Sequence, residues 1–76
     1  MPRLKCTFAE FITIIEANGF QLERHGGGSH AIWRREADGA VRKVVVAAHS
    51  MTDEIKPGTL SSMIRQSGLP KRLFRK

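Results

Sequence analysis

The chain has 76 residues, which predicts one domain spanning residues 1–76 with a small core. Hydrophobic residues make up 41% of it and charged residues 26%, a balance that excludes a disordered chain. The net charge is +6, from 13 Lys and Arg against 7 Asp and Glu. This surplus favours a polyanionic partner such as nucleic acid, although an acidic protein or an anionic membrane surface would be attracted by the same field.

Cysteine usage and hydropathy predict a cytoplasmic protein. Cys6 is the single cysteine, so an internal disulfide is impossible, as suits a reducing compartment. We interpret Cys6 as a small residue before the first helix rather than as a reactive thiol. No apolar run approaches the roughly 20 residues of a membrane span, and residues 1–5 lack the apolar stretch of a secretion signal.

The first predicted element is a helix from Phe8 to Asn18. Thr7 and Glu10 have the spacing of a capping box at its start. Apolar residues then recur at helical spacing and form one stripe: Phe8, Phe11, Ile12 and Ile15. Gly19 supplies a left-handed end to the helix.

Three strands are predicted next, followed by a second helix. Residues 20–24 alternate between apolar and polar, residues 29–35 suit a pleated surface, and residues 40–48 centre on a run of three valines. Residues 36–39 end in Asp-Gly, the strongest local signal for a hairpin turn. A polar connection of residues 49–56 leads to Pro57, which suits the first turn of a helix that ends at Gly68. Residues 70–76 form a short basic tail.

This order predicts an α+β fold. Short connections imply a three-stranded antiparallel sheet, and the apolar stripes of the two helices are buried by packing on one face of it. The opposite face stays open, bounded by Arg and Lys, and is where a partner would lie. Trp33 is expected to point toward the helices, so that His30, Ile32 and Arg34 share the open face.

The residues around His30 are the most informative chemical feature. Gly26, Gly27 and Gly28 carry no side chains, so a phosphate backbone could approach their amides closely; the alternative is a plain flexible loop. His30 could move a proton near neutral pH, or it could be a strand histidine bonded to a backbone carbonyl. His25, His30 and His49 are scattered, with no Cys or carboxylate at ligand spacing, so we expect no metal and no cofactor.

Two clusters of basic residues favour a phosphate-binding surface over chance scatter. One cluster flanks the hairpin: Arg34, Arg35, Arg42 and Lys43. The other is the tail, in which Leu73 and Phe74 could touch anionic lipid, although the segment is too short to hold a membrane alone.

Several motifs resemble those of the HicA-type toxins, also called the YcfA-like family. Gly28-Ser29-His30-Ala31-Ile32-Trp33 resembles the family's Gly-Ser-His-x-x-aromatic signature. Residues 8–20 look like its first helix ending in Asn-Gly-Phe, and residues 44–49 like its third strand leading to a histidine. Residues 56–60 match its Lys-Pro-Gly-Thr-Leu, and residues 64–69 resemble its closing Ile-x-x-x-Gly-Leu. Ala47 departs from the family, which often has proline there, as do Ala31 and the loose glycine loop.

The resemblance implies a fold like a double-stranded-RNA-binding domain. It also implies a toxin that cleaves messenger RNA without the ribosome, is neutralised by a HicB-type antitoxin, and uses His30 as its essential histidine. The RNA-binding residues are then expected to be Gly27, Gly28, Ser29, Arg34, Arg35, Arg42, Lys43 and His49. The second proton-transfer group is open, with His49 as a guess. The alternatives are a non-catalytic RNA-binding module and a mainly structural partner of an acidic antitoxin.

Overall fold

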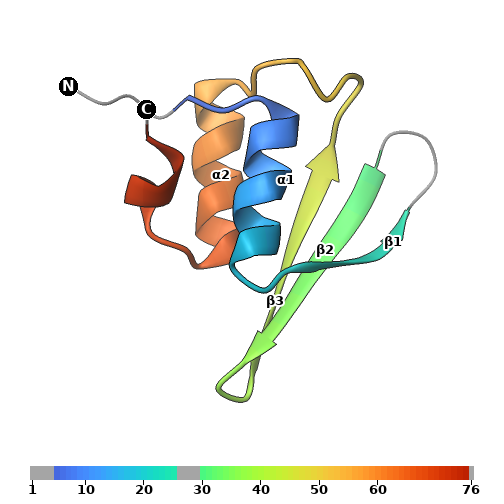
Figure 1. Ribbon diagram of the computed structural model, residues 1–76, viewed down its shortest axis with the longest axis vertical. Helices are drawn as coiled ribbons and strands as arrows, with labels where there is room; N and C mark the ends of the chain where they lie inside the picture. The colour runs from blue at the N-terminus through green and yellow to red at the C-terminus, as the bar shows by residue number, and fades with distance from the viewer. Residues whose placement is uncertain (1–4, 26–29, 76) are drawn as a thin grey trace.

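The computed structural model describes residues 5–25 and 30–75 of the chain. Their elements follow the order α-β-β-β-α and end in a short 3₁₀ helix (Figure 1). The bounds are α1 Phe8–Ala17, β1 Gln21–His25, β2 His30–Ala37, β3 Ala40–Ala47, α2 Pro57–Ser67 and η1 Lys71–Phe74. The strands form one antiparallel sheet in the order β1-β2-β3, and α1 and α2 lie side by side against it (Figure 1). The predicted α+β class and element order are confirmed.

Helix α1 begins where the sequence predicts it. The Thr7 side chain accepts a hydrogen bond of 3.1 Å from the backbone N–H of Glu10. The Glu10 carboxylate in turn accepts one of 2.9 Å from the backbone N–H of Thr7. The capping box therefore satisfies two amide donors that the helix itself leaves free.

The strands of the β2–β3 hairpin extend closer to the turn than the sequence predicts, and the turn itself is shorter. Glu36 and Ala37 pair with Val41 and Ala40, so they belong to β2, and the turn consists of two residues rather than the predicted residues 36–39. Asp38 and Gly39, with φ angles of 53° and 76°, form this turn. Two consecutive positive φ angles match the right-handed twist of the flanking strands, as the Asp-Gly pair predicted.

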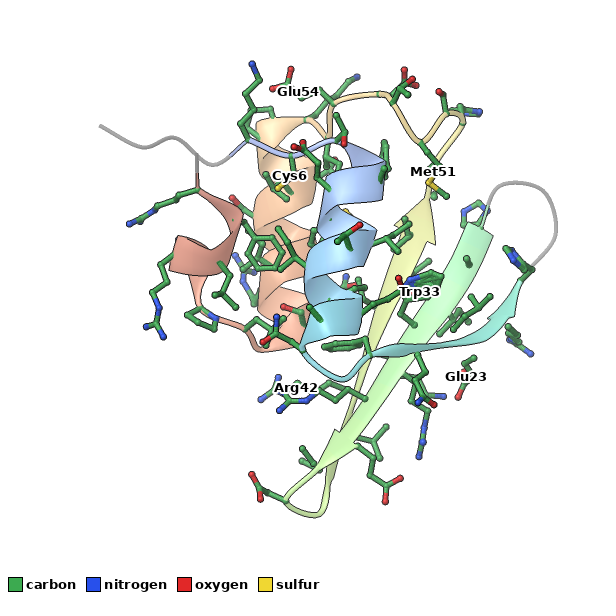
Figure 2. The ribbon with its side chains drawn as sticks, viewed as in Figure 1. Cys6, Glu23, Trp33, Arg42, Met51 and Glu54 are labelled. Atoms are coloured by element: carbon green, nitrogen blue, oxygen red, sulfur yellow. The ribbon has the colours of Figure 1, made fainter. Side chains whose placement is uncertain are left out.

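The core lies between the sheet and the helices. Of the apolar stripe predicted on the first helix, Phe11 and Ile15 are buried in this core, and Phe8 and Ile12 are partly buried and pack against it. The buried side chains are Cys6, Phe11, Ile15, Phe20, Trp33, Val44, Val46, Ile55, Leu60, Met63, Ile64 and Phe74. Trp33 is 6% exposed and lies between α1 and the strands (Figure 2), which confirms its predicted inward direction. Cys6 is 1% exposed, in agreement with its interpretation as a small residue before the helix.

Part of the predicted basic tail, residues 70–76, is folded. Residues 71–74 form η1, and the Phe74 ring stacks on Phe11 with 5.2 Å between the ring centroids. Phe74 is 1% exposed, so it cannot touch a lipid surface. The backbone N–H of Lys5 and the Cys6 thiol both donate to the Phe74 carbonyl oxygen, at 3.4 and 3.7 Å. The segment near the C-terminus thereby closes the core beside α1.

The connection from β3 to α2 is held against the start of α1. Phe8 and Ala9 donate backbone hydrogen bonds of 3.0 and 2.9 Å to the carbonyl oxygens of Asp53 and Met51. Ile55 donates one of 2.8 Å to Cys6, and its side chain is buried. This connection therefore has a defined path, which matters because it carries His49.

Candidate functional site

His30 opens strand β2 on the face of the sheet that the helices leave uncovered. Trp33 points into the core, and side chains alternate along a strand, so His30 and Ile32 point the other way. The His30 side chain is exposed, as the sequence analysis required. Directly opposite it on β3 stands Ala47, a small residue that leaves space beside the imidazole.

A cleft of about 390 Å³ begins at Ala47 and lies between the end of β3 and the start of α2. Its lining residues are Phe8, Ala47, His49, Asp53, Glu54, Lys56 and Thr59. His49 brings an imidazole and Lys56 an ammonium group to its wall, beside the carboxylates of Asp53 and Glu54, and all four side chains are exposed. The first turn of α2 holds no acidic residue and no side-chain cap, and the carboxylates of the cleft, Asp53 and Glu54, come from the connection before it.

The register bounds the separation of the two histidines. Opposed Cα atoms in an antiparallel pair are roughly 4.5–5.5 Å apart, which applies to His30 and Ala47. Two further residues to His49 add at most about 7 Å. The two Cα atoms are therefore within about 13 Å of each other. The sequence alone offered His49 only as a guess, and the strand register is what places it near His30.

Arg34 and Lys43 also lie on the open face, directly opposite each other on β2 and β3. Both are already paired with carboxylates. Glu23 lies 3.7 Å from Arg34 and 3.2 Å from Lys43, and Glu36 lies 2.8 Å from Arg34. These are exposed ion pairs, which contribute about 0–1 kcal/mol each and exchange readily for another anion.

Arg35 and Arg42 do not join this face. They are opposite each other in the register, on the side of the sheet that carries the helices. Arg35 is also five residues along β2 from His30, about 17 Å at the rise of a strand. Of the predicted residues, His30, Arg34 and Lys43 share the open face, with the Arg34–Lys43 pair four residues, or about 13 Å, along the strands from the His30–Ala47 pair, while Arg35 and Arg42 form a separate group on the other face.

The remaining predicted residues lie elsewhere. Gly27, Gly28 and Ser29 are outside the described residues, as is Gly26. His25 is paired with Ala31, next to His30 in the chain, but it lines an apolar cleft on the helix side with Ile12 and Met51, on the opposite face of the sheet from His30. Within residues 5–25 and 30–75, no group of three or more His, Cys, Asp or Glu gathers in a way that could hold a metal ion.

Sequence reasoning missed the part that α2 plays in the cleft. Lys56 and Thr59 line it, yet both stood out only as members of a motif resembling a family's helix start. One local signal in the sequence could have drawn attention to Lys56. It precedes Pro57 at the start of a helix whose first turn has neither an acidic residue nor a capping side chain. What it could not reveal is that this helix start lies beside the end of β3.

Comparison with known proteins identifies the family. A family model described as the HicA toxin of bacterial toxin–antitoxin systems matches residues 8–69, from the start of α1 to just past the end of α2. A search of curated proteins and a search of solved structures found no match. No helix among the described residues is long and apolar enough to cross a membrane. The matched region covers most of the chain and includes His30, His49 and the whole cleft, and the chain therefore belongs to the HicA toxin family of toxin–antitoxin systems.

Proposed function

We propose that this toxin is an endoribonuclease that cleaves messenger RNA without the ribosome and without a metal ion, with His30 as a proton-transfer residue. One observation carries the proposal. His30 is exposed at the start of β2, directly opposite Ala47, and Ala47 lines a cleft that also holds His49 and Lys56. A phosphodiester bound beside Ala47 would then lie near both histidines, with the Lys56 ammonium group to offset the carboxylates of Asp53 and Glu54 in the same cleft.

The chemistry that fits two imidazoles is attack by the ribose 2′-hydroxyl on the adjacent phosphorus. His30 takes the proton of the 2′-hydroxyl as the bond from its oxygen to phosphorus forms. The bond from phosphorus to the 5′-oxygen breaks, and His49 gives that oxygen a proton. Lys56 stabilises the negative charge on the phosphate oxygens. The products are a 2′,3′-cyclic phosphate and a 5′-hydroxyl end, and no metal, oxidant or cofactor is needed.

The open face would carry the RNA strand away from the cleft. Arg34 and Lys43 lie on the same face as His30, and their exposed ion pairs with Glu23 can be replaced by phosphate oxygens. Gly27, Gly28 and Ser29 precede His30 in the chain, and we keep them as proposed phosphate contacts on sequence grounds. Messenger RNA as the substrate implies that the toxin acts in the cytoplasm.

The test is a set of three histidine variants with purified protein and a defined RNA. His30→Ala should slow cleavage by about 10²- to 10⁴-fold, the usual contribution of one acid or base, and His49→Ala should slow it within the same range. His25→Ala is the matched control, because His25 is exposed but lies on the helix side. Circular dichroism establishes that each variant is folded. Cleavage by His30→Ala at the parent rate would refute the mechanism.

Two further observations separate this function from its alternatives. A chelator such as EDTA should leave the cleavage rate unchanged, and the new RNA ends should carry the cyclic phosphate. If the protein binds RNA with a steep salt dependence but leaves it intact, it is a non-catalytic RNA-binding module. If it neither binds nor cleaves RNA, its role is that of a structural partner of the antitoxin.

A further inference from the structure

Arg35 and Arg42 form a pair of like charges at the hairpin end of the sheet. They are directly opposite each other on β2 and β3, so their side chains leave the sheet on the same face. Like charges at directly opposed positions destabilise an antiparallel pair. A sheet that keeps two arginines in this arrangement needs something to offset their repulsion.

The ends of both helices supply part of that offset. A Cβ atom added to Gly68 would lie 2.5 Å from the Arg42 Nε, and one added to Gly19 would lie 3.5 Å from the Arg35 Nε. The two guanidinium groups therefore lie against the glycines at which α2 and α1 end, and Figure 2 shows Arg42 beyond these helix ends. Carbonyl groups at a helix C-terminus carry partial negative charge and favour a cation.

The guanidinium donors themselves are not used within the described part of the chain. The ion pairs found there join Arg34 and Lys43 to Glu23 and Glu36, and neither Arg35 nor Arg42 takes part in any of them. Both arginines line a cleft of about 210 Å³ at the hairpin, together with Ala37, Asp38 and Ala40. The cleft holds two guanidinium groups against the single carboxylate of Asp38, so it keeps a positive charge, and a guanidinium suits a further carboxylate, which accepts two parallel hydrogen bonds from it.

We propose that the Arg35–Arg42 cleft is a docking site for an acidic side chain of the antitoxin. Membership of a toxin–antitoxin family implies an antitoxin partner, and the net charge of +6 on this chain favours acidic side chains on the surface that binds it. The cleft lies on the opposite face of the sheet from His30 and about 17 Å along β2 from it. An RNA strand that follows the open face past Arg34 and Lys43 does not reach it. The proposal rests on the family and on this geometry, and it does not require His30 to be catalytic.

The experiment measures the affinity of the toxin for the antitoxin encoded beside it, by isothermal titration calorimetry. Arg35→Gln/Arg42→Gln keeps most of each side chain but removes both charges. Its dissociation constant should rise by about 30-fold or more, because loss of a buried charged partner at an interface has effects of this size. The matched control is Arg65→Gln/Arg72→Gln, which removes two exposed charges from α2 and η1 and should change affinity less than about threefold.

A lysine variant separates the shape of the site from its charge. Arg35→Lys/Arg42→Lys keeps the net charge of the toxin but lacks the planar fork, so its affinity should still fall by about tenfold. Equal losses in the glutamine variant and its control would overturn the proposal, because only the overall charge would matter. Weaker RNA binding with unchanged antitoxin affinity would overturn it as well and assign the cleft to RNA.

One measurement needs no substitution and so cannot fail through misfolding. The Nε–H NMR signals of Arg35 and Arg42 in the unaltered toxin should shift when the antitoxin is added, while those of Arg65 and Arg72 stay in place. Signals of Arg35 and Arg42 that do not move would refute the proposal. Because this readout is independent of RNA cleavage, it holds whether or not the histidine variants behave as expected.

Discussion

Phe74→Ala tests whether the segment after α2 is part of the folded core. The Phe74 side chain is 1% exposed, and its ring stacks on Phe11 at 5.2 Å with an angle of 23° between the planes. Truncating a buried phenylalanine to alanine costs about 3–5 kcal/mol. At roughly 0.05–0.15 kcal/mol per residue, a domain of this size has a free energy of unfolding of about 4–11 kcal/mol. One substitution in a segment that the sequence suggested was a tail should therefore remove a large part of the total.

The assay is urea unfolding followed by tryptophan fluorescence. Trp33 is the single tryptophan of the chain and is buried, so its emission reports on the core directly. At about 4–8 °C per kcal/mol for a domain of this length, Phe74→Ala should also lower the melting temperature by at least about 12 °C. Arg72→Ala, an exposed change in the same 3₁₀ helix, should stay within about 0.5 kcal/mol of the parent. A loss below about 1 kcal/mol in Phe74→Ala would show that η1 is not packed against α1.

Four further predictions concern turns, caps and the open face. Gly39→Ala should cost about 1–2 kcal/mol, because its φ of 76° is unfavourable for alanine although the space around it is empty. Gly68→Ala should lower the free energy of unfolding by more than Gly39→Ala does, because its added Cβ also lies 2.5 Å from the Arg42 Nε. In an Arg42→Ala background the two substitutions should lower it by similar amounts. If the difference between them stays the same, the contact with Arg42 is not its cause. Thr7→Ala should lower the free energy of unfolding by about 1 kcal/mol through loss of the cap, measured by the same urea titration. Glu23→Gln should change stability by less than about 1 kcal/mol but strengthen RNA binding and steepen its salt dependence, because it frees Lys43 and leaves Arg34 paired with Glu36 alone; unchanged binding would argue against an RNA path there.

Local signals in the sequence were reliable where the interacting residues are close along the chain. The capping box, the Asp-Gly turn and the proline at the start of α2 each depend on a few neighbouring residues, and all three are present. The strand boundaries were less accurate. Strand β2 runs two residues beyond the predicted end, because its last two residues pair with residues of β3. Pairing between strands is a tertiary property that local propensity does not report.

The candidate site shows the same division. Sequence motifs pointed to His30 and, less firmly, to His49, but not to the distance between them, which the pairing of His30 with Ala47 limits. The basic cluster at the hairpin was treated as one surface, yet alternation along paired strands sends Arg34 and Lys43 to the open face and Arg35 and Arg42 to the helix ends. Their different surroundings then follow from the fold: carboxylates of β1 and β2 for the first pair, helix ends for the second.

From the amino-acid order alone come the element sequence, the inward direction of Trp33 and the family, because periodicity, turn chemistry and motifs are properties of short segments. Only the tertiary structure could decide that Phe74 belongs to the core, that the start of α2 lies beside the end of β3, and that two arginines meet two helix ends. Each of these depends on contacts between segments that are far apart in the chain, and such contacts exist only once the sheet has closed against its helices.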